Sequence, residues 1–70
     1  MIVEKYLQLR YNESKWPYHG VNKLIYDLRD KLTIDQVRNE IRELMKNGQI
    51  DIVGGINGYL IKINEDKWFE

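Results

Sequence analysis

The sequence predicts a small α+β domain made of three helices and a C-terminal β-hairpin. Apolar residues recur at helical spacing along the first two thirds of the chain, and near its end two stretches alternate apolar and polar residues around a glycine-rich loop. With 70 residues, 43% of them hydrophobic and 31% charged, the chain has the composition of a folded protein. We expect one domain, residues 1–70, because a second core would leave each half too small.

The N-terminal third predicts one helix and a loop. Residues 2–10 carry apolar side chains at mostly three-to-four spacing, which favours a short amphipathic helix, with a strand as the alternative. Residues 11–20 contain Pro17 and Gly20, which favour a loop. Within that loop, we expect the aromatic cluster at residues 16–19 to cap one end of the core, with a partner-binding or stacking surface as the alternative.

Two more helices are expected in the middle of the chain, over residues 21–29 and 33–47, with a tight turn at about residues 30–32 between them. Thr33 and Gln36 have the spacing of a capping box, in which each side chain bonds the other residue's backbone N–H.

The same helix has a predicted end and a predicted buried face. Gly48 is placed to adopt the left-handed conformation that ends helices. The apolar stripe of the helix comprises Ile34, Val37, Ile41, Leu44 and Met45.

The last third predicts a hairpin over residues 50–63, with a turn at residues 54–58. A two-stranded hairpin is marginal alone in water, so its apolar face must lie on the helices. The tail is ambiguous: Trp68 and Phe69 either complete the core or form an apolar patch suited to a dimer contact.

Three helices covered by one hairpin is the winged-helix architecture. The chain also resembles the winged helix-turn-helix domains of bacterial and bacteriophage regulators, of the kind found at the N-terminus of the biotin repressor. In that family a recognition helix of the form Val-Arg-x-x-Ile-x-x-Leu-x-x-x-Gly leads into a wing whose second strand carries Gly-Tyr. Residues 37–48 and the pair Gly58-Tyr59 match this pattern. Residues 27–32 depart from it, because family members commonly have Ala and Gly there.

The resemblance implies a non-enzymatic, sequence-specific DNA-binding protein, a small transcription regulator that inserts helix 33–47 into the major groove and uses hairpin 50–63 as its wing. At about 100° per residue, the apolar stripe leaves a polar face with an arginine flank. We expect base contacts from Gln36, Arg38, Asn39 and Arg42. We expect phosphate contacts from Lys46, Asn22 and Lys23, with the wing-tip residue Asn57 and the nearby cation Lys62 along the backbone or minor groove.

The charge balance favours a rival interpretation. Eleven Lys and Arg residues match eleven Asp and Glu residues, and the wing tip has no Lys or Arg. In the rival, the polar helix is merely solvated and a protein partner binds to exposed aromatic side chains, namely Trp16, Tyr18, Trp68 and Phe69. Steep salt dependence of binding would favour DNA over such an aromatic interface.

The composition also argues against other classes of protein. There is no cysteine and only His19 as histidine, so we expect no metal site and no cofactor. No apolar run approaches the roughly 18–20 residues of a membrane span, and the start lacks the layout of a signal peptide, so we expect a cytoplasmic protein. The expected partner is double-stranded DNA. Because a core this small adds only about 3–5 kcal/mol of stability, association as a homodimer or with a protein partner is a further expectation.

Overall fold

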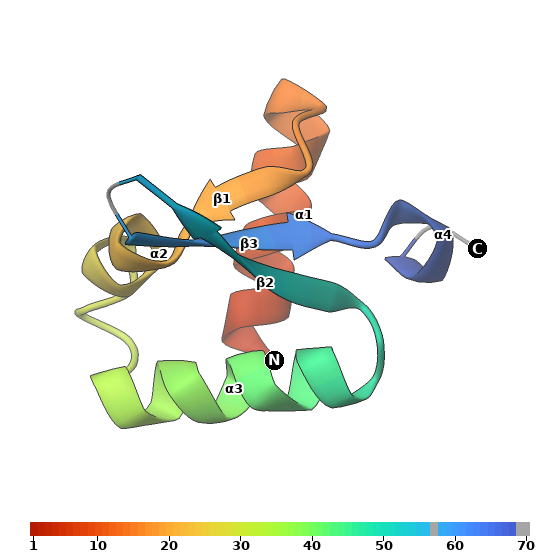
Figure 1. Ribbon diagram of the computed structural model, residues 1–70. Helices are drawn as coiled ribbons and strands as arrows, with labels where there is room; N and C mark the ends of the chain where they lie inside the picture. The colour runs from red at the N-terminus through yellow and green to blue at the C-terminus, as the bar shows by residue number, and fades with distance from the viewer. Residues whose placement is uncertain (57, 69–70) are drawn as a thin grey trace.

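A computed structural model describes residues 1–56 and 58–68 of the chain. The elements follow one another as α1 (Ile2–Ser14), β1 (Tyr18–Gly20), α2 (Val21–Asp27), α3 (Ile34–Lys46), β2 (Ile50–Gly55), β3 (Gly58–Ile63) and α4 (Glu65–Trp68). The predicted α+β class is confirmed. The described residues nevertheless form four helices and a three-stranded antiparallel sheet, where the sequence predicted three helices and a hairpin (Figure 1).

The sheet has the strand order β1-β3-β2, so β3, the last strand of the chain, is central. Ile61 of β3 lies opposite His19 of β1 on one side and Ile52 of β2 on the other. Successive side chains of a strand point to opposite faces. Ile61 and Ile63 therefore share the buried face, and Lys62 lies on the other, which we call the outer face of the sheet.

The core fills the space between the helices and the inner face of the sheet. It draws on α1, α2, α3, β2 and β3, and in Figure 1 α3 runs beneath the sheet while α1 passes behind it. Its buried members are Val3, Leu7, Leu24, Leu28, Val37, Ile41, Leu44, Ile50, Ile61 and Ile63. Every element longer than four residues thus contributes to a single apolar cluster.

The predicted ends of α3 are confirmed. Gln36 N donates to Thr33 Oγ1 at 3.2 Å, and Thr33 N donates to Gln36 Oε1 at 2.9 Å, which completes the capping box. Gly48, two residues beyond the helix, has φ 75°. Only a residue without a Cβ adopts this conformation at little cost, so the chain turns there into β2.

The predicted loop at residues 11–20 is wrong at both ends. The helix predicted to end at residue 10 continues to Ser14, whose Oγ donates to Arg10 O, and it ends where Lys15 adopts φ 58°. After Pro17, residues 18–20 form β1, which the sequence analysis did not predict. A strand of three residues is too short for alternation to be recognised, and its partner residues lie 40 to 44 positions away along the chain.

Two smaller boundary predictions were also wrong. The helix predicted over residues 21–29 ends at Asp27, and the chain continues as a turn in which Arg29 N donates to Tyr26 O and Lys31 N donates to Leu28 O, each three residues back. Gly54 and Gly55, predicted as part of the hairpin turn, belong to β2. A Cβ on Gly55 would lie 2.9 Å from Gly58 O, so close pairing of the strands requires glycine there.

The exposure of Trp16 differs from the prediction, and the structure decides between the two alternatives left open for Trp68. Trp16, expected to cap the core, is 64% exposed, whereas Trp68 packs against the core and its Nε1 donates to Gln8 Oε1. Ile34 and Met45, at the two ends of the predicted apolar stripe of α3, are 52% and 43% exposed, so the described part of the chain leaves both ends of the stripe partly uncovered. Phe69 lies outside the described residues.

Candidate nucleic-acid interface

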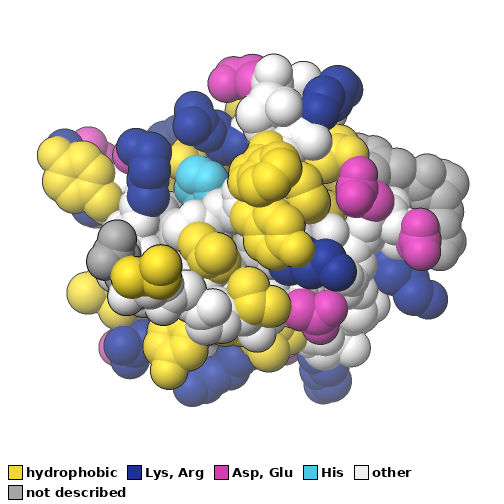
Figure 2. Space-filling model, turned by 45° about the horizontal axis from the view of Figure 1, so that its top comes forward, with side chains coloured by type: hydrophobic (Ala, Val, Ile, Leu, Met, Phe, Trp, Pro, Cys, Tyr) yellow, Lys and Arg dark blue, Asp and Glu magenta, His cyan; other side chains and the backbone are white. Residues whose placement is uncertain are grey.

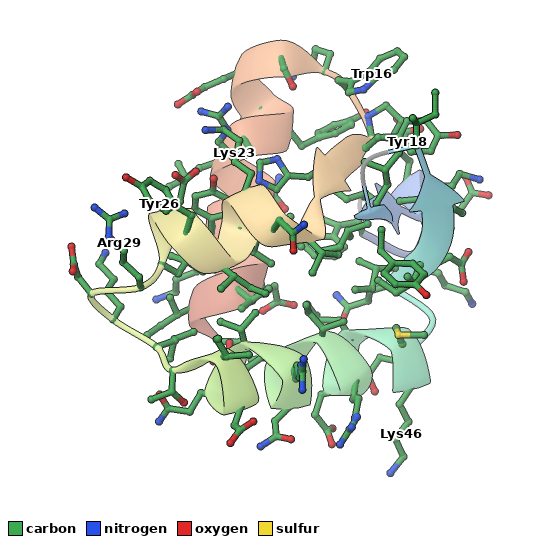
Figure 3. The ribbon with its side chains drawn as sticks, turned by 60° about the vertical axis from the view of Figure 1, so that its left-hand side comes forward. Trp16, Tyr18, Lys23, Tyr26, Arg29 and Lys46 are labelled. Carbon is green, nitrogen blue, oxygen red and sulfur yellow. The ribbon has the colours of Figure 1, made fainter. Side chains whose placement is uncertain are left out.

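The solvent-facing side of α3 brings together five of the nine predicted site residues. Because Val37, Ile41 and Leu44 are fully or almost fully buried, the opposite side of the helix faces solvent. The predicted site residues exposed on this side are Gln36, Arg38, Asn39, Arg42 and Lys46. Figure 3 shows Lys46 projecting away from the body of the molecule, on the side opposite Trp16 and Tyr18.

A hydrogen bond between α3 and α1 helps to fix the orientation of α3 relative to the rest of the molecule. Glu40 is half-buried at the edge of the packed face, and its Oε1 accepts the backbone N–H of Val3 at 3.0 Å. That N–H lies in the first turn of α1, where helical donors have no partner within the helix. Glu40 therefore satisfies a free donor of α1 and joins the two helices.

The cations on the exposed side form no ion pair with any described residue. Among the described residues, neither of the two ion pairs involves Arg38, Arg42 or Lys46. Two exposed carboxylates, Asp35 and Glu43, lie on the same helix, so the cations are in excess on this side. Unpaired guanidinium and ammonium groups on a convex helix can contact phosphates or base edges.

Gln36 differs from its neighbours because the helix cap already uses part of its side chain. Oε1 of Gln36 accepts from Thr33 N. Paired recognition of adenine by glutamine needs both the amide oxygen and the amide nitrogen. Gln36 can therefore donate through Nε2 with the cap intact, whereas in a bidentate contact Oε1 would be shared between Thr33 N and the base.

The hairpin places a second set of residues near the start of α2. A Cβ on Gly58 would lie 3.2 Å from Asn22 Nδ2, so Asn22 sits beside the hairpin tip. Ile56 at that tip is fully exposed. Asn57, predicted as a wing contact, lies outside the described residues. Tyr59, which sequence reasoning did not single out, is 66% exposed on the helix-facing side of β3, and the Gly-Tyr pair was the signal that marked it.

The structure does not bring Lys23 and Lys62 onto the α3 side. Lys62 lies on the outer face of the sheet, directly opposite Tyr18 and Asp51. Lys23 pairs with Asp27 at 3.8 Å, and in Figure 3 it lies toward the same end of the molecule as Trp16.

A polar cluster between α1, β1 and α2 lies next to Lys23. The Tyr6 hydroxyl donates to Asp27 Oδ2, and burial together with this bond raises the pKa of Tyr6 to about 12. The same bond is the main cause that lowers the pKa of Asp27. Burial, with a contribution from Arg10, lowers the pKa of His19, whose ring meets Tyr6 edge-on at 5.2 Å. The environment of His19 therefore favours its neutral form.

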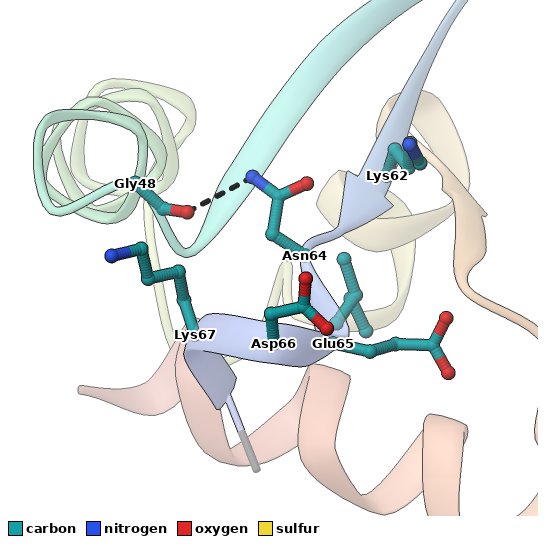
Figure 4. Close-up of a pocket in the computed structure, with 7 residues that line it drawn as sticks. Gly48, Lys62, Asn64, Glu65, Asp66 and Lys67 are labelled. Atoms are coloured by element: carbon teal, nitrogen blue, oxygen red, sulfur yellow. Dashed lines mark hydrogen bonds between the residues drawn. The ribbon is translucent and has the colours of Figure 1, made fainter. Parts of the chain in front are cut away.

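A shallow pocket beside α4 contains groups of both charges. Figure 4 shows the hydrogen bond in which Asn64 Nδ2 donates to Gly48 O, at 2.9 Å, and Lys62, Glu65 and Lys67 line the same pocket. The contact ties the end of β3 to the turn after α3, so the pocket follows from how the hairpin is anchored. Over the described ranges 1–56 and 58–68, no three His, Cys, Asp or Glu side chains come together as a metal site. No helix within those ranges is long and apolar enough to cross a bilayer.

Comparison with family models, with curated proteins and with solved structures finds no match to this chain.

Proposed function

We propose that this chain is a non-enzymatic, sequence-specific binding module for double-stranded DNA. In this proposal α2 and α3 act as a helix-turn-helix, α3 enters the major groove, and the β2–β3 hairpin serves as the wing of a winged-helix domain. Base contacts come from Arg38, Asn39 and Arg42, with Gln36 contributing through Nε2. Lys46 and Asn22 bind phosphates.

The observation that carries the proposal is the exposed side of α3. It combines the side chains that discriminate base edges, since arginine pairs with guanine and asparagine with adenine. None of its three cations is held in an ion pair among the described residues. A helix about 10–12 Å in diameter with its side chains fits the major groove, which is about 12 Å wide.

The arrangement around α3 supports the proposal. The helix is preceded by α2 and a turn over residues 28–33, and it is followed by a hairpin whose tip lies beside Asn22. This is the order of elements that the resemblance to winged helix-turn-helix regulators implies. In this chain, α3 carries the family's Val-Arg pair at residues 37–38, and β3 carries its Gly-Tyr pair at residues 58–59. The proposed role is therefore that of a small transcription regulator.

The test is fluorescence anisotropy of labelled duplex DNA titrated with the protein at about 50 and 200 mM salt, first with mixed-sequence DNA and then with a site obtained by in vitro selection. Each phosphate contact steepens the logarithmic salt slope by about 0.9. We expect saturable binding that weakens steeply at the higher salt, together with a preference for the selected site. No binding at high micromolar protein in the lower salt would overturn the proposal.

A double variant, Arg38→Ala with Asn39→Ala, tests the residues assigned to base contacts. Each good contact discriminates by about 1–3 kcal/mol, so affinity for the selected site should fall at least about tenfold and site preference should disappear. The matched control is Arg10→Ala with Asn12→Ala, which removes the same residue types from the exposed side of α1. If the α3 variant keeps both affinity and site preference, the helix assignment is wrong.

A further inference from the structure

Two adjoining hollows lie across the outer face of the sheet, and we call them together the sheet hollow. One is lined by residues that include Trp16, Tyr18 and Lys23, the other by residues that include Ile56, and both share Gly20 and Leu60. Figure 2 shows hydrophobic side chains gathered over this part of the surface, with Lys, Arg and the single His beside them. Exposed apolar groups gathered in one place mark a binding surface more often than scattered ones do.

Strand register explains why the surface is hollowed there. Gly20, Leu60 and Val53 lie side by side across the three strands on the outer face. Gly20 has no side chain, so Leu60 forms a half-buried apolar floor. At one end, Trp16 packs against Tyr18 with ring centroids 5.5 Å apart and forms a wall. At the other end stands Ile56, which is fully exposed.

The charged side chains that line the sheet hollow have one sign. Among the described residues that line it, Arg10 and Lys23 are the charged ones, and no carboxylate is present. Nearby carboxylates lie outside the lining: Asp27 accepts the hydroxyl of Tyr6 as well as pairing with Lys23, Glu13 lies 3.8 Å from Arg10, and Asp51 lies opposite Lys62. The hollow therefore joins an apolar floor to a cationic rim.

We propose that the sheet hollow binds a segment of a partner protein in which a large apolar side chain, aliphatic or aromatic, stands next to aspartate or glutamate. The apolar side chain lies on Leu60 against the Trp16 wall, and the carboxylate pairs with Arg10 and Lys23. A second copy of this chain is a poor occupant. In a two-fold dimer each patch meets itself, and the lining has no carboxylate to receive either cation.

The Trp16 end of the hollow, with Tyr18 and Lys23, lies on the side of the molecule away from Lys46 of α3 (Figure 3). Its other end is the hairpin tip beside Asn22, which the proposed DNA contact uses. The contacts assigned to the peptide belong to the Trp16 end, so the proposed peptide contact and the proposed DNA contact use different residues. A module of this kind would bind DNA through α3 and hold a second protein through the sheet.

The experiment begins with a phage-displayed library of random 12-residue peptides selected against the intact chain. Enriched peptides are then synthesised with a fluorescein label, and their binding is measured by anisotropy. We expect enriched sequences to pair Asp or Glu with Leu, Phe or Trp. Trp16→Ala and Lys23→Gln should each weaken binding at least about tenfold, as is typical for central contacts of an interface.

Matched controls separate the sheet hollow from the rest of the surface. Tyr26→Ala removes another aromatic side chain of similar exposure, and Lys31→Gln removes another exposed lysine, and neither residue lines the hollow. Both should leave peptide affinity unchanged. Because Trp16 is mostly exposed, its variant should stay folded, and circular dichroism verifies this.

The outcomes also separate this proposal from DNA binding. The double variant Arg38→Ala with Asn39→Ala should bind the peptide normally, and saturating duplex DNA should not displace it. The proposal is overturned if no peptide is enriched, if enriched peptides lack acidic residues, or if Trp16→Ala has no effect. It is also overturned if the hollow instead binds an oligothymidine strand, or if sedimentation shows a dimer that Trp16→Ala dissociates.

Discussion

The exposed side of α3 and the outer face of the sheet lie on opposite sides of one core, and they differ in how they carry charge. On α3, three cations project from a convex helix without ion pairs among the described residues. On the sheet, Arg10 and Lys23 each stand near a carboxylate and border an apolar hollow. A convex row of unpaired cations fits a grooved polyanion, whereas a cationic rim around an apolar floor fits a mixed peptide.

The contrast shows why a net charge of zero says little about partners here. The formal balance of eleven cations and eleven anions holds for the whole chain. Folding places Asp27 against Tyr6 and Glu40 against the backbone of Val3, so two of the carboxylates are engaged internally. A local excess of exposed positive charge then arises on α3, although the whole chain has a formal charge of zero.

The largest expected effect comes from breaking the core that both faces share. Leu44 is fully buried on α3, so Leu44→Ala should lower the free energy of unfolding by about 2–5 kcal/mol. A core of this size supplies only about 3–5 kcal/mol, so the variant should be largely unfolded and lose both binding activities. Chemical denaturation followed by circular dichroism measures this. The neighbouring Met45→Ala is the control, because a side chain that is 43% exposed contributes little.

A smaller effect on stability is expected from a change at the start of α3 that leaves the outer face of the sheet untouched. Thr33→Ala removes the hydroxyl that accepts Gln36 N, which should lower the free energy of unfolding by about 0.5–2 kcal/mol. Thr33→Ser keeps the hydroxyl and should stay close to the parent chain. At temperatures where both variants are folded, peptide binding at the sheet hollow should be unchanged. Equal destabilisation by Ala and Ser would mean that the cap hydrogen bond contributes nothing.

A positive charge placed at the hairpin tip tests whether the tip contacts the same DNA as α3. Ile56 is fully exposed there, so Ile56→Lys should add one phosphate contact and steepen the logarithmic salt slope of DNA binding by about 0.9. Anisotropy titrations at several salt concentrations measure the slope, and Ile56→Gln serves as the uncharged control. A slope that does not change would place the tip away from DNA.

The smallest expected effect depends on pH and concerns the hydrogen bond from the Tyr6 hydroxyl to Asp27, the carboxylate that also pairs with Lys23. The hydrogen bond from Tyr6 lowers the pKa of Asp27 below 3.8. The stabilisation of the fold by this bond is therefore present above about pH 4, and it is lost as the pH falls through the pKa of Asp27 in the folded chain. The pKa of Tyr6 is raised from 10.0 to about 12, so the stabilisation is lost again as the pH rises between those values. Tyr6→Phe should therefore lower the melting temperature at neutral pH and converge with the parent chain at both extremes.

Melting temperatures across the pH range measure this difference. Tyr59→Phe removes the hydroxyl of a tyrosine that is 66% exposed, and it should show no such pH dependence. A constant difference between Tyr6→Phe and the parent chain at every pH would show that the hydroxyl does not stabilise the fold through Asp27.

The elements predicted well from the sequence are those that depend on neighbouring residues. The third helix was located by Thr33, Gln36 and Gly48, which act through hydrogen bonds and backbone conformation within a few residues, and the structure has all three in those roles. The hairpin was predicted for the same reason, although Gly54 and Gly55 proved to be strand residues.

What the sequence analysis missed depends on contacts between distant segments. β1 exists because residues 18–20 meet β3, and nothing in three residues announces this. Helical periodicity places Ile34 and Met45 on the apolar stripe, but whether they are covered depends on where other elements end. The separation of Lys23 and Lys62 from the α3 cations likewise follows from the packing of the sheet. The sequence analysis therefore grouped five residues that the structure does place together on the exposed side of α3 with two cations that lie elsewhere.

The shortness of β1 has a consequence for motion. Only three residue pairs and the contact from Ile63 N to Pro17 O, at 2.7 Å, hold this part of the chain to β3. Hydrogen exchange reports local opening, which costs least where few contacts must break. Amides in β1 should exchange faster than those of β3 that pair with β2. An occupant of the sheet hollow would then slow exchange at residues 18–20, and a ligand on α3 would not.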